Sequence, residues 1–96
     1  MFVLITYDVN TETAAGKKRL YKVAKQCKNY GQRVQHSVFE CLIDPALFKQ
    51  LQNKLEKIID PEKDSVRFYF LGDEWRRRVE HIGVKTGVDL EGMLLV

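Results

Sequence analysis

Cysteine is scarce in this chain of 96 residues, which holds only Cys27 and Cys41. One disulfide would be a thin framework for a secreted domain, and both cysteines occupy apolar positions of their segments, so we expect buried, reduced thiols. His36 and His81 lie far apart in the chain, and neither accompanies a cysteine pair at metal-binding spacing, which argues against a zinc site. The sequence therefore offers neither a disulfide nor a zinc ion to hold a small fold together.

Long hydrophobic runs are also missing. The longest one ends at Ile5, far short of the roughly 20 residues that span a bilayer, and it lacks the basic start and the cleavage site of a signal peptide. We therefore expect a soluble, cytoplasmic protein. A chain of this length has material for one core, so residues 1–96 are expected to form a single domain. Because so small a core leaves little margin over conformational entropy, we also expect an oligomer.

Acidic residues are absent between Thr13 and Phe39, although the net charge of the whole chain is only +3. The basic residues of this stretch are Lys17, Lys18, Arg19, Lys22, Lys25, Lys28 and Arg33. Without carboxylates at i,i+4 spacing these cations repel one another unless an external anion neutralises them, which favours a phosphate backbone over an ordinary solvated helix face. A second basic cluster consists of Arg76, Arg77 and Arg78.

Apolar patterns predict four strands and two helices. Residues 2–9 are rich in β-branched and aromatic side chains and predict the first strand, and residues 66–71 predict the last of the four. Residues 33–43 read either as two short strands around His36 and Ser37 or as one strand with a bulge. Residues 77–82 are expected to add a short C-terminal edge strand.

Helical spacing of apolar residues recurs twice. The first pattern follows a cap at Asn10, Thr11 or Thr13 and ends near Gly31, so that one side is apolar and the other is basic. The second starts with the Asp-Pro pair at 44–45 and stops at the Asp-Pro pair at 60–61.

The resulting order, βαββαβ with a tail, is that of the α+β ferredoxin-like sandwich. In this architecture two helices cover one face of a four-stranded antiparallel sheet, and the other face has no cover. Since the strands carry apolar residues on both sides, a two-fold dimer that packs sheet on sheet is the expected way to bury the second face.

Asp8 is the only acidic residue in the first eleven residues, and it stands where the first strand ends. A strand end is a usual place for a metal ligand, but one carboxylate cannot satisfy Mg²⁺, which prefers six oxygens. A two-fold dimer would supply a second Asp8, while water and substrate phosphate would complete the shell. The alternative is that Asp8 is a turn residue that hydrogen-bonds the nearby backbone.

Several segments together resemble the small CRISPR-associated Cas2 family. They are Tyr-Asp-Val at 7–9, the basic helix, the block Gly-Gln-Arg-Val-Gln-His-Ser-Val-Phe-Glu-Cys at 31–41, and Arg-Val-Glu-His-Ile-Gly at 78–83. The resemblance runs essentially from end to end, and the tail is most similar to members from type I systems. Its most specific part is the Tyr-Asp strand end followed about 25 residues later by the Arg-Val-Gln block.

The resemblance implies a homodimer whose tail, from about residue 73, is exchanged with or packed on the partner subunit. It also implies Mg²⁺, with Mn²⁺ as a substitute, held by the Asp8 pair, and a role in spacer acquisition beside the Cas1 integrase. Family members are described as metal-dependent endonucleases acting on RNA or DNA. Asp8 matches the family's metal residue, and Arg33, Ser37 and Phe39 match its block near the cleft.

We therefore expect a CRISPR adaptation protein that binds double-stranded DNA as a homodimer and cleaves phosphodiester bonds with Mg²⁺ at the catalytic residue Asp8. Expected nucleic-acid contacts are Lys17, Lys18, Arg19, Lys22, Arg33, Ser37, Phe39, Arg76, Arg77 and Arg78. Two alternatives stay open: a non-catalytic DNA-binding scaffold for the integrase, and a metal-dependent endoribonuclease. No side chain stands out as the general base.

Overall fold

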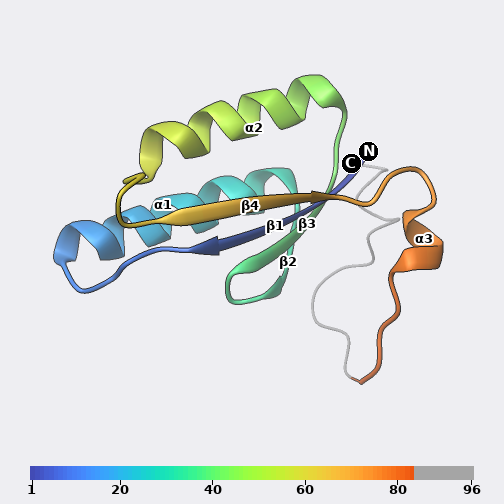
Figure 1. The fold of residues 1–96 in the computed structure, drawn as a ribbon, viewed down its shortest axis with the longest axis horizontal. Coiled ribbons are helices and arrows are strands. Elements are labelled where there is room, and N and C mark those ends of the chain that lie inside the picture. Colours follow the sequence, from blue (N-terminus) through green and yellow to red (C-terminus); the bar gives the residue numbers. More distant parts are fainter. Residues whose placement is uncertain (84–96) are drawn as a thin grey trace.

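The computed structural model describes residues 1–83 of the chain (Figure 1). Its elements are β1 (Phe2–Asp8), α1 (Ala14–Tyr30), β2 (Gln32–Gln35), β3 (Val38–Leu42), α2 (Pro45–Ile58), β4 (Ser65–Phe70) and α3 (Trp75–Arg78). The predicted order βαββαβ is confirmed, and a short third helix follows it.

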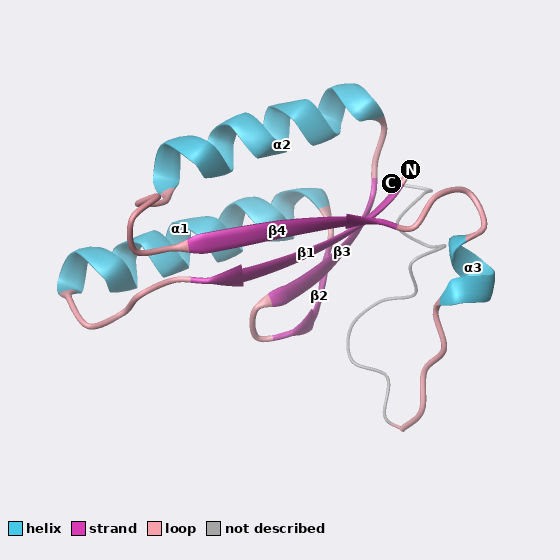
Figure 2. Ribbon diagram, viewed as in Figure 1, coloured by secondary structure: helices cyan, strands magenta, loops and turns pink. Residues whose placement is uncertain are grey.

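The four strands form one antiparallel sheet in the order β2-β3-β1-β4. Figure 2 shows both long helices on the same side of this sheet. The register sets Ile5 of β1 opposite Phe39 of β3 on one side and opposite Phe68 of β4 on the other. The architecture is therefore the predicted ferredoxin-like α+β sandwich, with one sheet face covered by α1 and α2.

The block at 33–43 folds as two strands joined by a turn at His36 and Ser37. Between Arg33 and Gln35 the register of β2 against β3 shifts by one residue. Both predictions for this block therefore apply in part, because the segment is a hairpin and also carries an irregularity in its first strand.

Both long helices begin at the residue types that favour helix caps. The side chain of Thr13 accepts a hydrogen bond from the backbone N–H of Gly16 at 3.0 Å, and the Asp44 carboxylate accepts one from the N–H of Leu47 at 2.7 Å. Pro45 occupies the first turn of α2, where its missing N–H costs nothing. Local sequence thus sets where each helix starts.

The core lies between the sheet and the helices. Alternate residues of β1 point into it, with Val3 and Ile5 fully buried and Tyr7 nearly so. Cys27 and Cys41 are buried, free thiols, as predicted, and burial raises the pKa of each to about 12. Among the helices of residues 1–83, none combines the length and the apolar character that crossing a membrane requires.

The edge strand predicted at 77–82 is wrong for the described part of the chain. Residues Trp75–Arg78 form a helical turn, and no strand follows among residues 79–83. Two contacts favour the turn: the Trp75 ring stacks on Phe2 with centroids 4.9 Å apart, and Arg78 donates a 2.9 Å hydrogen bond to the carbonyl oxygen of Leu71. The expected tail exchange falls largely on residues 84–96, which lie outside the described residues.

Candidate functional site

The sheet face opposite the helices carries the candidate site. Leu4, Thr6 and Asp8 alternate with the buried residues of β1, so they point to this uncovered face. Residues paired across an antiparallel ladder share a face, and β4 contributes their partners there. These partners are Tyr69 opposite Leu4, Arg67 opposite Thr6, and Ser65 opposite Asp8.

Asp8 is exposed at the last position of β1. It borders an open hollow of about 280 Å³ whose other lining residues are Thr6, Tyr7, Ser65, Arg67 and Tyr69. The side chains that point to this face contribute carboxylate and hydroxyl oxygens together with one guanidinium, whereas the side chain of Tyr7 points into the core. The hollow therefore combines one anionic, one cationic and several hydroxyl groups on the same surface.

The donor set of this hollow fits a hard cation better than a zinc ion. Asp8 supplies a carboxylate, and Thr6 and Ser65 supply hydroxyls, whereas neither cysteine nor histidine lines the hollow. Within residues 1–83 no group of three or more His, Cys, Asp or Glu residues could hold a metal ion. A single chain thus contributes one carboxylate, that of Asp8, to the hollow.

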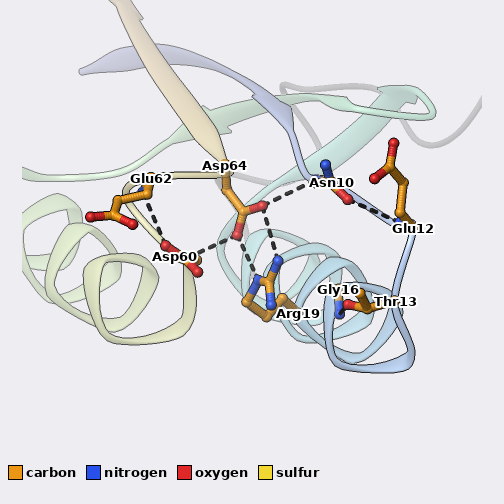
Figure 3. A network of polar contacts seen from close by, with 8 residues as sticks. All are labelled: Asn10, Glu12, Thr13, Gly16, Arg19, Asp60, Glu62 and Asp64. Carbon is orange, nitrogen blue, oxygen red and sulfur yellow. Dashed lines mark hydrogen bonds and ion pairs between the residues drawn. The ribbon is translucent and has the colours of Figure 1, made fainter.

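A buried carboxylate, Asp64, supports the strand ends on which the site is built (Figure 3). Its Oδ2 accepts a 2.7 Å hydrogen bond from Nε of Arg19 and a 2.8 Å bond from the backbone N–H of Asp60. Its Oδ1 accepts a 3.0 Å bond from the backbone N–H of Asn10. Because Asn10 follows Asp8 by two residues and Asp64 directly precedes Ser65, the carboxylate fastens both strands next to the hollow.

The loop between β1 and α1 is also held by close packing. A Cβ atom on Gly16 would lie 2.0 Å from the carbonyl oxygen of Asn10, so only glycine allows the loop to approach α1 this closely. The Asn10 side chain in turn accepts a hydrogen bond from the N–H of Glu12 at 3.0 Å. The loop that follows Asp8 is therefore constrained by its packing against α1 and by the hydrogen bond that the Asn10 side chain accepts.

Opposing effects act on the pKa of Asp64. Burial alone would raise it, but hydrogen bonds from Arg19, Asp60 and Asn10 and the nearby guanidinium charge outweigh burial and leave the pKa below its ordinary value. Asp64 therefore carries its negative charge throughout the neutral range.

Asp64 is not among the residues predicted from the sequence, although one feature of the sequence indicates its partner. Arg19 precedes the buried Val23 by four residues and thus lies toward the apolar side of α1, unlike a freely solvated lysine. Its side chain is only 17% exposed and pairs with Asp64. The structure accordingly gives Arg19 an internal partner that the other basic residues of α1 lack among the described contacts.

Two other predicted nucleic-acid residues have roles inside the fold. Phe39 is 0% exposed, because its place opposite Ile5 puts it on the helix-covered face, so it is excluded as a nucleic-acid contact. Ser37 lies in the turn between β2 and β3, where its carbonyl oxygen accepts a hydrogen bond from the N–H of Tyr7 at 3.1 Å. Arg33 is exposed and sets its guanidinium over the Phe39 ring, 5.2 Å from the centroid.

The remaining basic residues are exposed but separate into two groups. Lys17, Lys18 and Lys22 lie in the first half of α1, and this helix begins just after Asp8. The arginines of α3 lie at the opposite end of the long axis of the molecule (Figure 1). The two basic clusters therefore do not meet within one chain, and their contact with nucleic acid stays a prediction.

Comparison with known proteins identifies the family that the chain resembles. The family model described as CRISPR associated protein Cas2 matches residues 1–79. The chain is 60% identical over 96 residues to the CRISPR-associated endoribonuclease Cas2 of Chlorobaculum tepidum, with 100% of each chain covered. It is 56% identical over 95 residues to the CRISPR-associated endonuclease Cas2 of Halalkalibacterium halodurans, with 99% of each chain covered.

A solved structure supports the same conclusion. The crystal structure of Streptococcus pyogenes Cas2 at pH 6.5 shares 61% sequence identity with the chain and a TM-score of 0.76. The match covers 86% of this chain and 100% of that one. The fold and the sequence relationship agree, and the chain belongs to the Cas2 family of CRISPR-associated proteins.

Proposed function

We propose that this protein is a metal-dependent endonuclease of CRISPR adaptation that acts in the cytoplasm as a homodimer, with Asp8 as its metal ligand. The observation that carries the proposal is the exposed Asp8 carboxylate at a strand end, in a hollow that also holds hydroxyls and a guanidinium. The names of its relatives, endoribonuclease in one case and endonuclease in another, support the reaction class.

In the proposed mechanism the Asp8 carboxylates of the two subunits would hold one Mg²⁺, which Mn²⁺ could replace. When bound, the ion supplies a water of lowered pKa and neutralises charge on the phosphate. Asp8 provides the ligand, and the Asp64 hydrogen bonds keep its strand end in place. No side chain that lines the hollow is an evident general base, so we assign none.

We further propose that the substrate is double-stranded DNA held through its backbone, and that the dimer assembles with the Cas1 integrase. The proposed phosphate contacts are the exposed cations Lys17, Lys18, Lys22, Arg33, Arg76, Arg77 and Arg78. Arg19 is left out, because its guanidinium already pairs with Asp64. Backbone contacts of this kind bind unrelated sequences alike.

Two specific observations favour second candidates. The relative from Chlorobaculum tepidum is named an endoribonuclease, which favours RNA as the substrate. The single in-chain carboxylate and the missing general base favour a DNA-binding scaffold for the integrase, in which Asp8 has no catalytic role. All three candidate functions use the same surface of the protein. One assay that compares several substrates and variants can therefore distinguish them.

The test is cleavage of labelled duplex DNA and single-stranded RNA by the wild type, Asp8→Asn and a control, Glu56→Gln. Glu56 is an exposed carboxylate on α2, on the far side of the sheet from the hollow. We expect the wild type and Glu56→Gln to cut DNA with Mg²⁺ and to stop in excess chelator, and Asp8→Asn to be inactive. Cleavage of RNA alone would favour the endoribonuclease, and undiminished cleavage by Asp8→Asn would overturn the metal mechanism. Intact spacer insertion by a variant that cannot cleave would favour the scaffold.

A further inference from the structure

The outward side of α1 carries a strip of exposed side chains. Its members are Lys18, Tyr21, Lys25 and Lys28, and we call them the α1 strip. They follow one another at intervals of three or four residues, so they lie on one face of the helix. Tyr21 stands inside this basic strip and, at 68%, is the most exposed aromatic side chain of residues 1–83.

The α1 strip remains accessible in the expected dimer. Val23 and Cys27 lie on the other side of α1, where both are fully buried in the core. Figure 2 shows α1 on one side of the sheet, whereas the second subunit is expected to cover the opposite side. A sheet-on-sheet dimer therefore leaves the strip in contact with solvent.

Tyr21 differs from the other three tyrosines of the chain. The hydroxyls of Tyr7, Tyr30 and Tyr69 each take part in a hydrogen bond within residues 1–83. Tyr21 forms none there, and the lysines of the α1 strip form no ion pair with a carboxylate in the same part of the chain. The polar groups of the strip are thus not used inside the described fold.

A basic strip around an aromatic ring has the chemistry that a single-stranded nucleic acid requires. Lys18 and Lys25 lie about one helical turn before and after Tyr21, so a positive charge flanks the ring on each side. Ammonium groups can neutralise phosphates, and an unpaired base can stack on the ring. A duplex would meet the same charges, but its bases are already paired and stacked, so they leave the ring without a partner.

The simpler alternative is a solvated helix face, because single exposed aromatic residues are ordinary on protein surfaces. α2, in the same layer, has such a face. Its exposed residues include the carboxylate of Glu56, and its Lys54 donates a 2.8 Å hydrogen bond to the hydroxyl of Tyr30. α1 has no carboxylate at all, so its lysines lack the pairs that stabilise a solvated helix. This contrast favours an external anion on α1.

We propose that the α1 strip binds a single-stranded segment of nucleic acid, with an unpaired base stacked on Tyr21 and the flanking phosphates held by the lysines. The inference goes beyond the proposed nuclease, because this binding needs neither Asp8 nor a divalent ion. It gives the protein a second nucleic-acid surface, on the opposite side of the sheet from the hollow.

The test measures binding of a short fluorescent oligothymidylate and of a duplex of equal length, both in EDTA. Tyr21→Leu should weaken single-strand binding about tenfold, through the loss of one base–aromatic stack, and should leave duplex binding unchanged. Tyr21→Phe keeps the ring and should bind as the wild type does. Lys25→Gln should lower the single-strand slope of log K against log salt by about 0.7. Lys49→Gln, the matched control at an exposed lysine of α2, should leave this slope unchanged.

Three results would overturn the proposal. One is single-strand binding by Tyr21→Leu with the affinity of the wild type. Another is an equal loss for the single strand and the duplex, because Tyr21 would then not act by stacking on a base. The third is binding of polyglutamate as tightly as of the single strand, which would assign the strip to an acidic protein. Asp8→Asn should bind the single strand like the wild type, so its cleavage assay tests the proposed nuclease separately.

Discussion

Arg19 and Asp64 lie 45 residues apart in the chain and form an ion pair, with Nε of Arg19 2.7 Å from Oδ2 of Asp64. The same carboxylate accepts hydrogen bonds from the backbone N–H groups of Asn10 and Asp60, so it joins α1 to the loops that follow β1 and α2 (Figure 3). Since Asp8 and Ser65 lie next to these loops, the ion pair connects the folding of the helix layer to the geometry of the candidate site.

Replacing Asp64 by asparagine should destabilise the fold. The amide keeps the shape but loses the charge, and one of its two polar ends is a donor that would face existing donors. Hydrogen bonds to a charged buried group predict a loss of roughly 2 kcal/mol in the free energy of unfolding, which corresponds to about 10 °C in Tm for a domain of this size. Thermal unfolding measures this change in Tm. The control is Asp73→Asn, which changes an exposed carboxylate. A Tm equal to that of the control would show that Asp64 does not stabilise the fold.

The same carboxylate predicts a specific dependence of stability on pH. Its pKa in the folded protein is lower than in the unfolded chain, where an aspartate titrates near about 4. Its contribution to stability is therefore fully present above about pH 4 and is lost as the pH falls through the lower, folded-state pKa. Urea unfolding at neutral pH and at about pH 3 should show a larger loss for the wild type than for Asp64→Asn. Equal losses in the two proteins would contradict the assigned shift.

Much of the fold could be predicted because its signals are local. The caps at Thr13 and Asp44 and the alternation in β1 each arise from a few neighbouring residues. The Arg19–Asp64 pair could not be predicted, because it depends on how two distant loops meet. Phe39, by contrast, could have been oriented from the sequence, because it lies two residues before Cys41 in the same strand and therefore shares the face of that buried thiol.

The candidate site could likewise be predicted only where its signals are local. The strand-end position of Asp8 followed from the sequence, and the alternation around Arg67 indicates that it points away from Val66 and Phe68. Only the pairing of β4 with β1 brings Arg67 beside Asp8. The turn at Trp75 was missed because the stack on Phe2 that accompanies it joins two residues far apart in the chain.

The uncovered sheet face predicts a dimer. Tyr69 is 43% exposed on this face and lies opposite the half-buried Leu4, so a second sheet packed there would remove apolar surface from water. We expect sedimentation of the wild type near twice 11.2 kDa at micromolar concentration. Tyr69→Glu should shift the protein toward a monomer, because burying an unpaired carboxylate is costly.

Tyr21→Glu is the matched control for the dimer, since Tyr21 is 68% exposed but lies on α1, in the other layer. It should leave the sedimentation coefficient unchanged. A folded wild-type monomer, or a Tyr69→Glu protein that remains fully dimeric, would exclude this face as the interface.

The basic surface of α1 predicts a salt-dependent interaction with DNA. Lys17→Gln and Lys18→Gln, combined in one chain, should weaken binding to unrelated duplexes equally and lower the salt slope by about one for each phosphate that these lysines neutralise. Anisotropy titrations at several salt concentrations measure both effects. An unchanged slope, or weaker binding to one DNA sequence alone, would show that these lysines do not contact the backbone.

The number of divalent ions bound per chain distinguishes a shared Asp8 site from a surface without a metal. Electron paramagnetic resonance of Mn²⁺ titrated into the purified protein counts bound ions without any need for cleavage. We expect one Mn²⁺ for every two chains in the wild type, because two Asp8 carboxylates share the ion, and none at this site in the folded Asp8→Asn dimer. Equal Mn²⁺ binding by the wild type and Asp8→Asn, or no binding by either, would contradict this expectation.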